Sequence, residues 1–259
     1  TLQCRTEALN EKILRKLIGG RGYGAYLLYN LAGPTTKPLD PQNPFILSTG
    51  PLTGTPLAGS KFAVITKSPL TGLFLDSYSG GELAGEIKYA GYDHIVIQGR
   101  CARPSYLFIE DEKVELRDAS HIWGKTTFDA EEILIKEHGG ETKILVTGPA
   151  GEKLVPFACV CTDYYHQSGR GGAGAVLGSK NLKAVVVKGS QKNQIADLSA
   201  LRNVLEAQRE SMEKGTAGLK KLGTASMVNV ANSIGALGVH NRSEEQSPRA
   251  SEISGERIR

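Results

Sequence analysis

The residues best suited to chemistry lie in two glycine-rich loops, Ser79–Gly81 and Ser168–Gly172. Glycine lets the backbone approach a ligand closely, and successive N–H groups at the start of a helix form a site for anions. Arg170, inside the second loop, adds a cation that can make a charge-assisted hydrogen bond to phosphate. The loops therefore predict a ligand with anionic groups, and the alternative is that each is only a tight turn between strand and helix.

Neither loop matches the common nucleotide motifs. No Gly-Lys-Ser/Thr sequence closes either loop as it does in a P-loop. Neither loop has the strand before it and the acidic residue about 20 positions after it that mark a dinucleotide fingerprint. A single mononucleotide is therefore not the expected ligand.

The two loops occupy equivalent places in a duplicated sequence. The first copy runs from Phe45 to Gly99 through Thr49-Gly-Pro51, and the second from Ile144 to Gly189 through Thr147-Gly-Pro149. Two related copies with equivalent loops suit a large, pseudo-symmetric ligand with two similar anionic ends. We expect the loops to face each other, related by approximate twofold symmetry.

The elements that must position these loops indicate the α+β class. Short β-branched runs bounded by Gly or Pro predict strands, and apolar residues at helical spacing predict helices between them. We expect a duplicated β-α-β unit, with two related sheet-and-helix halves that form a cradle, followed by the start of an all-helical domain. The predicted domains are a ligand-binding domain over 1–189, a polar linker over 190–194 and an incomplete helical region over 195–259, with helices starting at Asp197 or Ser199 and at Thr224.

Composition excludes several classes of partner. The net charge of +4 is small and dispersed, with no basic stripe, so we expect no nucleic acid. No apolar run approaches the roughly 20 residues that cross a bilayer, so no membrane is expected either. The chain opens at Thr1 without a signal peptide, which suggests that the true N-terminus is missing. Four cysteines show no disulfide framework, which favours the cytoplasm.

Two further groups have simpler alternatives to chemistry. Cys159 and Cys161 alternate in an apolar strand pattern and so face the same side, but two thiolates are only half of a tetrahedral metal site. We interpret them as buried strand cysteines. Glu131 and Glu132 fall on a predicted helix with Lys136, a pattern typical of a solvated ion-pair face.

Longer phrases in a fixed order carry a family resemblance. They are Gly19-Gly-Arg-Gly22, Gly50-Pro-Leu-Thr-Gly-Thr55, Thr66-Lys-Ser-Pro-Leu-Thr-Gly72, Ser79-Gly-Gly81, Tyr89-Ala-Gly-Tyr-Asp93, Arg117-Asp-Ala-Ser-His-Ile-Trp-Gly124, Gly148-Pro-Ala-Gly-Glu152 and Gly169-Arg-Gly-Gly-Ala-Gly-Ala-Val-Leu-Gly-Ser-Lys-Asn-Leu-Lys-Ala184. With these phrases, nearly the whole chain resembles the N-terminal domain of tungsten-containing aldehyde ferredoxin oxidoreductases.

The resemblance implies a bis-pterin cofactor of tungsten (or molybdenum), with a magnesium ion that bridges its phosphates. It implies cofactor contacts at Lys61, Tyr78, Ser79, Gly80, Gly81, His166, Gln167, Ser168, Gly169, Arg170 and Gly171. Magnesium would be held by the backbone carbonyls of Tyr78 and Gln167. The family often has Arg, Asn and Ala where this chain has Lys61, Tyr78 and Gln167, and Lys keeps the charge of Arg without its bidentate fork.

The resemblance also implies an activity and partners. The family oxidises aldehydes to carboxylic acids and passes electrons to ferredoxin or to a partner electron-transfer subunit. Its 4Fe-4S cluster needs four cysteines in a motif that this chain lacks, so the cluster and the catalytic residues are expected beyond Arg259. Two alternatives stay open, a benzoyl-CoA-type ring reductase subunit of the same family and a non-redox module that binds a phosphorylated ligand. Assembly into a homo-oligomer also stays open.

Overall fold

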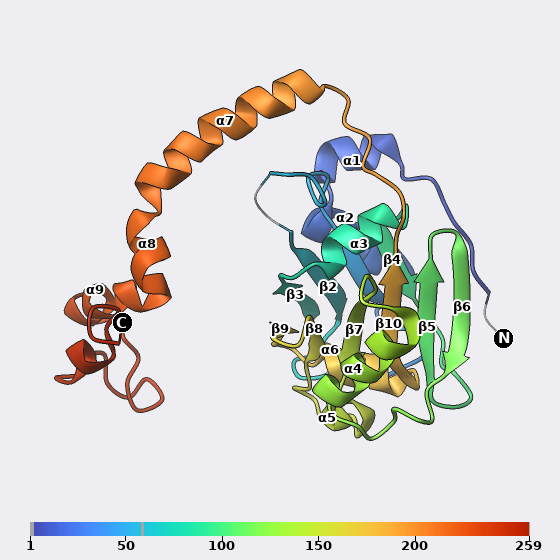
Figure 1. Ribbon diagram of the computed structural model, residues 1–259. Coiled ribbons are helices and arrows are strands. Elements are labelled where there is room, and N and C mark those ends of the chain that lie inside the picture. The colour runs from blue at the N-terminus through green and yellow to red at the C-terminus, as the bar shows by residue number, and fades with distance from the viewer. Residues whose placement is uncertain (1–2, 58–59, 259) are drawn as a thin grey trace. The chain divides into compact units, whose positions relative to one another are not determined.

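The computed structural model describes residues 3–57 and 60–258, and the chain divides into two compact units, residues 1–194 and 195–259 (Figure 1). Residues 190–194 pack with the first unit. The Gln191 N–H donates to Tyr89 O at 2.9 Å, and Asn193 Nδ2 donates to Thr53 O at 2.9 Å.

The first half of unit 1 is a four-stranded antiparallel sheet between two helices. After α1 (Glu11–Leu17), it contains α2 (Gly20–Leu31), β1 (Phe45–Thr49), β2 (Phe62–Lys67), β3 (Phe74–Ser79), α3 (Leu83–Tyr89) and β4 (His94–Ile97). The strand order is β3-β2-β1-β4. β3 is therefore an edge strand, and the first glycine loop follows it directly.

The second half repeats this arrangement. It contains α4 (Thr127–His138), β7 (Lys143–Thr147), the short α5 (Pro149–Glu152), β8 (Val160–Thr162), β9 (His166–Ser168), α6 (Ala173–Ser179) and β10 (Leu182–Lys188). A hairpin of β5 (Ser105–Glu110) and β6 (Lys113–Asp118) extends its sheet to the order β6-β5-β10-β7-β8-β9. Since β9-β8-β7-β10 matches β3-β2-β1-β4, the predicted duplication is confirmed, and each copy contains a helix, three antiparallel strands, a second helix and a fourth strand.

The register of the strands fixes which residues are equivalent in the two halves. Phe62 pairs with both Thr49 and Ser79, and Val160 pairs with both Thr147 and Ser168. Ser79 and Ser168 therefore occupy the same position, as the first residues of the two glycine loops. By the same register, Tyr78 corresponds to Gln167.

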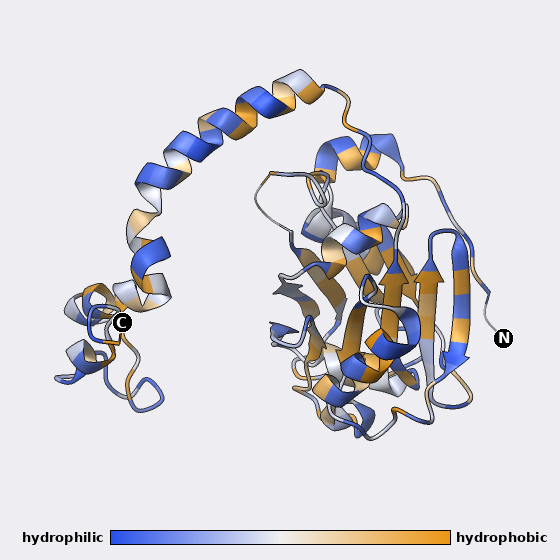
Figure 2. Ribbon diagram, viewed as in Figure 1, coloured by the Kyte–Doolittle hydropathy of each residue, from blue (hydrophilic) through white to orange (hydrophobic). Residues whose placement is uncertain are grey.

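The main hydrophobic core lies between the two sheets. It joins Leu47 and Val64 of the first sheet, Leu145 and Val185 of the second, and apolar residues of α3 and α6. α3 contacts β7 and β10 of the other half, while α6 contacts β1 and β2. On the outer faces, α2 packs on the first sheet and α4 on the second. The central strands are accordingly apolar along most of their length (Figure 2).

Unit 2 is helical, as its sequence pattern predicted. Its elements are α7 (Leu198–Gly215), α8 (Ala217–Leu222), α9 (Val228–Ser233) and 3-10 turns over Gly223–Met227 and Ala250–Ile253. Asp197 caps α7, and its side chain accepts a hydrogen bond from the Ala200 N–H at 2.8 Å. The continuous helix predicted from Thr224 to about Ala236 is wrong, because a 3-10 turn replaces its first part and α9 stops before Gly235, whose φ is +71°. None of the described helices is long and apolar enough to span a bilayer.

Candidate functional site

Both glycine loops lie where the halves meet, at opposite ends of two neighbouring edge strands. β3 and β9 are the facing edge strands of the two sheets and contact each other. The loop after β3 reaches the turn before β9, where Asp163 Oδ2 accepts a hydrogen bond from the Glu82 N–H at 2.6 Å. A Cβ atom on Gly81, whose φ is +84°, would lie 2.1 Å from Asp163 Oδ2 and 3.1 Å from the His166 ring, so a larger residue would displace the side chain that holds this loop.

The loop after β9 reaches the first half in the same way. Ser68, in the turn before β3, donates from Oγ to Gly171 O at 2.7 Å, and this bond is buried. The Arg170 N–H donates to Ser77 Oγ of β3 at 3.5 Å. Each loop thus contacts the β-hairpin of the other half, and these contacts are reciprocal. That the two loops face each other stays a prediction.

Within this junction, the predicted cofactor residues differ in exposure. Lys61, Tyr78, His166, Gln167, Gly169 and Arg170 are exposed, Gly80 and Gly81 are half-buried, and Ser79, Ser168 and Gly171 are buried. The hydroxyls of Ser79 and Ser168 have no hydrogen-bond partner among the described residues. These two serines shape the strand ends, while the exposed residues are the ones that a ligand can reach.

The register places a different side chain beside each loop. One position beyond the Phe62–Ser79 pair, Lys61 stands opposite Gly80, and one position beyond the Val160–Ser168 pair, Cys159 stands opposite Gly169. The two halves therefore present a cation on one side and a thiol on the other.

The charges around the loops favour an anion. Neither Lys61 nor Arg170 forms an ion pair with a described residue, so both cations are free to meet a ligand. Over the residues that the structure describes, no three His, Cys, Asp or Glu side chains converge on one point as metal ligands. This set of charges fits a phosphorylated ligand.

The exposed tyrosine at the first loop is tied to neighbours in its own half. The Tyr78 hydroxyl donates to Asp76 Oδ2 at 3.0 Å, and Asp76 also pairs with Arg21 at 2.9 Å. Partial burial and the Asp76 carboxylate raise the pKa of Tyr78 above its usual value. The phenol therefore stays protonated, and its ring is oriented by the Asp76 bond.

A buried carboxylate supports the turn that holds the first loop. Glu131 of α4 is only 2% exposed, and its two oxygens accept the Tyr164 N–H at 3.3 and 3.1 Å. Burial raises its pKa to about 7. Asp163 and Tyr164 both have positive φ, +46° and +60°, a backbone conformation that non-glycine residues rarely adopt. The predicted solvated face is therefore wrong for Glu131, because its side chain points under the strained turn, whereas Glu132 does pair with Lys136 at 2.7 Å.

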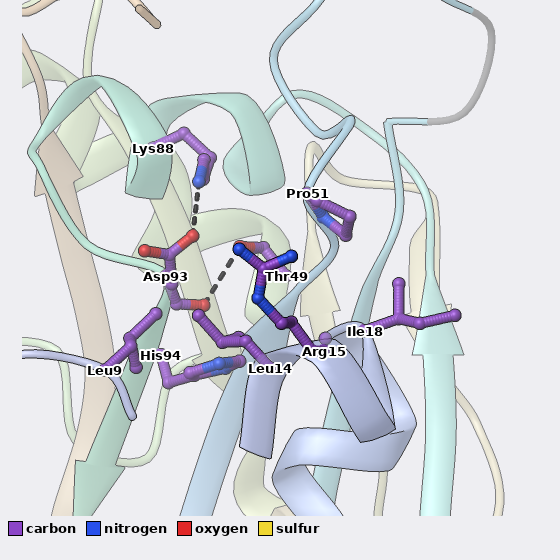
Figure 3. Close-up of a pocket in the computed structure, with 10 residues that line it drawn as sticks. Leu9, Leu14, Arg15, Ile18, Thr49, Pro51, Lys88, Asp93 and His94 are labelled. Atoms are coloured by element: carbon purple, nitrogen blue, oxygen red, sulfur yellow. Dashed lines mark hydrogen bonds and ion pairs between the residues drawn. The ribbon is translucent and has the colours of Figure 1, made fainter. Parts of the chain in front are cut away.

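A separate cavity of about 450 Å³ lies near the N-terminal helix, between α1, the end of β1 and the end of α3 (Figure 3). His94 borders it, with its ring stacked on Tyr23 at 4.6 Å. Because the Ser48 hydroxyl donates to Gly20 O, it accepts from His94 Nδ1, and burial lowers the pKa of His94 to about 4. His94 is therefore neutral at pH 7. None of the predicted cofactor residues lines this cavity.

Sequence reasoning missed the side chains that connect the halves. Ser68 and Ser77 were not singled out, although Ser68 lies in one of the family phrases. Their partners are far away in sequence, so no local spacing indicates them.

Comparison with known proteins gives concordant matches. A family model described as "Aldehyde ferredoxin oxidoreductase, N-terminal domain" matches residues 1–189. The chain is 45% identical to the tungsten-containing aldehyde ferredoxin oxidoreductase of Pyrococcus furiosus, over 99% of this chain and 43% of that protein. It is 40% identical to the WOR-like subunit of an aliphatic sulfonate oxidoreductase from the same organism, over 70% of this chain and 32% of that protein.

A solved structure is similar as well. The active-site complex BamBC of benzoyl coenzyme A reductase, bound to 1,5-dienoyl-CoA, superposes with a TM-score of 0.70 at 39% identity, over 72% of this chain and 29% of that one. The chain therefore spans less than half the length of the relatives that it matches.

Proposed function

The chain belongs to the aldehyde ferredoxin oxidoreductase family, and from this premise we propose that it forms the cofactor-holding part of a tungsten oxidoreductase. The proposed reaction oxidises an aldehyde to a carboxylic acid, with ferredoxin or a partner electron-transfer subunit as the acceptor. The proposed cofactor is a bis-pterin complex of tungsten or molybdenum, which supplies two-electron exchange at its metal when bound.

The observation that carries this proposal is the pair of equivalent loops at the junction of the two halves. Each loop lies beside the hairpin of the other half, so a ligand that touches both loops meets two similar surfaces. Lys61 and Arg170 add one cation from each half, and the half-buried Gly80 and the exposed Gly169 let a ligand approach the backbone closely. These features suit a ligand with two phosphorylated ends.

In this proposal, each residue has a limited role. Lys61 and Arg170 neutralise phosphate, His166 contacts the cofactor, and the glycine N–H groups donate hydrogen bonds to phosphate. The backbone carbonyls of Tyr78 and Gln167, at equivalent positions before the loops, would hold magnesium. Nothing in these roles moves a proton of the substrate, so we assign no catalytic residue to this chain.

Arg170→Ala tests the phosphate contact. A charge-assisted hydrogen bond contributes about 1.5–3 kcal/mol, so the variant should hold the cofactor about ten- to a hundredfold more weakly. Tungsten, molybdenum and pterin per chain are measured in the full-length protein after matched purification. Arg100→Ala, which removes an exposed arginine without an ion pair to a described residue, is the control.

The outcomes separate the alternatives. Unchanged cofactor content in Arg170→Ala rejects the phosphate role. A full-length protein that contains a phosphorylated ligand but neither tungsten nor molybdenum supports a non-redox binding module instead. Reduction of an aromatic coenzyme A thioester without aldehyde oxidation supports the second candidate, which the 39% identical benzoyl coenzyme A reductase complex favours.

A further inference from the structure

The two glycine loops contain backbone that is intrinsically flexible. Gly81 has a φ of +84°, and Gly171 and Gly172 have φ of +80° and +87°. Glycine reaches many conformations besides the one seen here, so ordering such a loop costs entropy that contacts must offset. The residues that make those contacts therefore decide where each loop lies.

One residue of each half makes such a contact, and the two residues have the same place in the fold. Ser68 is the first residue after β2, and Asp163 is the first residue after β8. β2 and β8 are equivalent strands, and the turns that follow them lead to the edge strands β3 and β9. Each turn reaches the glycine loop of the other half.

Asp163 lies directly against the first glycine loop. Its Oδ2 atom accepts the N–H of Glu82, the residue after Gly81, at 2.6 Å. A Cβ atom on Gly81 would be 2.1 Å from the same oxygen, so the loop is in close contact with the carboxylate. Lys143 of β7 also pairs with the Glu82 side chain, but that carboxylate is 72% exposed, and exposed pairs contribute little. The charge-assisted bond from Asp163 is therefore the stronger tie between this loop and the second half.

The turn that contains Asp163 is itself held in place by a buried side chain. Asp163 and Tyr164 have φ of +46° and +60°. Non-glycine residues keep this conformation only where their surroundings enforce it. Glu131 supplies that support, because its buried carboxylate accepts the Tyr164 N–H. The second half thus holds the Asp163 carboxylate where the first loop meets it.

Ser68 contacts the second glycine loop through a donated hydrogen bond. Its side chain is 1% exposed, and its hydroxyl donates to Gly171 O at 2.7 Å. The same oxygen accepts the Leu70 N–H at 3.2 Å, so the hydroxyl is oriented by its own turn. A Cβ atom on Gly172 would be 2.6 Å from Pro69 Cγ. The second loop therefore packs on the turn of the first half as closely as the first loop packs on that of the second.

We propose that Asp163 and Ser68 are reciprocal positioning residues, each of which fixes the glycine loop of the other half. Both act through the backbone of the loop, so neither has to touch a ligand. Removing Asp163 should loosen the first loop alone, and removing Ser68 should loosen the second loop alone. A general loss of stability cannot produce this pattern, because it would affect both loops.

Hydrogen exchange on the full-length protein without cofactor, resolved to single amides, tests the pattern. The Glu86 N–H donates to Glu82 O and reports on the first loop, and the Ala175 N–H donates to Gly172 O and reports on the second. In Asp163→Gly, the Glu86 amide should exchange about tenfold to a hundredfold faster than in wild type, with Ala175 unchanged. In Ser68→Ala, which loses a bond between neutral groups, Ala175 should exchange about two- to tenfold faster, with Glu86 unchanged.

Asp163→Asn is the matched control for the acceptor. Glycine and asparagine both tolerate the left-handed backbone at this position, but only asparagine keeps an oxygen that can accept the Glu82 N–H. The Asn variant should therefore protect the Glu86 amide better than the Gly variant does. Equal exchange in these two variants, or faster exchange at both loops in either Asp163→Gly or Ser68→Ala, overturns the proposal. If Asp163→Gly does not fold, Asp163→Asn and Ser68→Ala must still affect different loops.

Cofactor content separates this proposal from the proposed function. Where the loops hold the cofactor, which rests on the proposed function, Asp163→Gly and Ser68→Ala should both lower tungsten and pterin per chain, although neither removes a predicted cofactor contact. Loops that loosen as expected in protein that keeps its full cofactor content would support the positioning roles and contradict the role of the loops in holding the cofactor. Loops that exchange as in wild type would contradict the positioning roles, whatever the cofactor content.

Discussion

Gly171 and Gly169, two glycines of the second loop, contribute differently to the stability of the fold. A Cβ atom on Gly171, whose φ is +80°, would lie 1.6 Å from Leu75 Cδ1, whereas one on Gly169 would meet nothing within 4 Å. We expect Gly171→Ala to destabilise unit 1 by about 2–4 kcal/mol through overpacking and backbone strain. Gly169→Ala should change stability by less than about 1 kcal/mol. Urea unfolding of the cofactor-free proteins measures both, and equal effects of the two substitutions would contradict this reading of the loop.

The exposed and the buried residues of the site differ in how well sequence could predict them. The glycine loops and Arg170 were found because their backbone and charge requirements are local, and the structure places both loops at the junction of the two halves. The support below them was missed or misread. Glu131 looks like an exposed helix residue until α4 docks on the second sheet and turns it inward. Its partner, the Tyr164 N–H, is 33 positions away.

At the scale of elements, the β8–β9 turn should make stability depend on pH. The folded state raises the pKa of Glu131 to about 7 from an ordinary 4.5, so the folded protein binds this proton more tightly than the unfolded chain does. The contribution of this group to stability therefore falls as pH rises from about 4.5 to about 7, by up to about 3 kcal/mol. Glu131→Gln keeps an acceptor for the Tyr164 N–H and removes the charge. In urea unfolding, the free energy of unfolding of this variant relative to wild type should rise between pH 5 and pH 8. If both proteins lose stability with pH in parallel, burial does not raise the pKa of Glu131.

Two lysines of β10 form ion pairs, and replacing them should change the stability of the protein by very different amounts. Lys183 and Glu152 form a fully buried pair, and Glu152 also accepts the Gly124 N–H at 2.9 and 3.0 Å. Lys183→Met leaves a buried carboxylate without its cation and should cost about 3–5 kcal/mol. Lys188, in the same strand, pairs with Glu110 at the surface at 3.1 Å, and Lys188→Met should cost less than about 1 kcal/mol. Thermal unfolding of both variants is the measurement, and similar melting temperatures would contradict the prediction.

The sequence predicted best those helices and strands that a single local feature determines. The β-branched runs became the central strands, and Asp197 caps α7 as its type suggests. The helix predicted from Thr224 failed because an apolar stripe was read without the glycines around it. Gly223, with φ of +61°, and Gly235 interrupt the helical backbone on either side. Strand order could not be read from one sequence, since it depends on pairings such as Cys161 with Gln167 and Val185 with Leu107.

At the scale of the whole molecule, the two units should differ sharply in local stability. Unit 1 has three clusters of buried apolar residues, whereas α7, α8 and α9 contain no buried residue. Few buried contacts imply low free energies of local opening. In hydrogen exchange on the 259-residue chain, amides of α7 should exchange at least a hundredfold faster than those of β1 and β10. Equal protection in both units would show that α7 is stabilised by contacts that its exposure does not reveal.

The reciprocal contacts between the two halves indicate how unit 1 evolved. α3 packs on the second sheet and α6 on the first, while each glycine loop contacts the other half's hairpin. These are the isologous contacts of a twofold homodimer, drawn into one polypeptide. We infer that the unit descends from a gene for a single half, which was doubled and fused. Fusion releases the two copies from identity, so one could acquire Lys61 where the other acquired Cys159, a divergence that a true homodimer can never make.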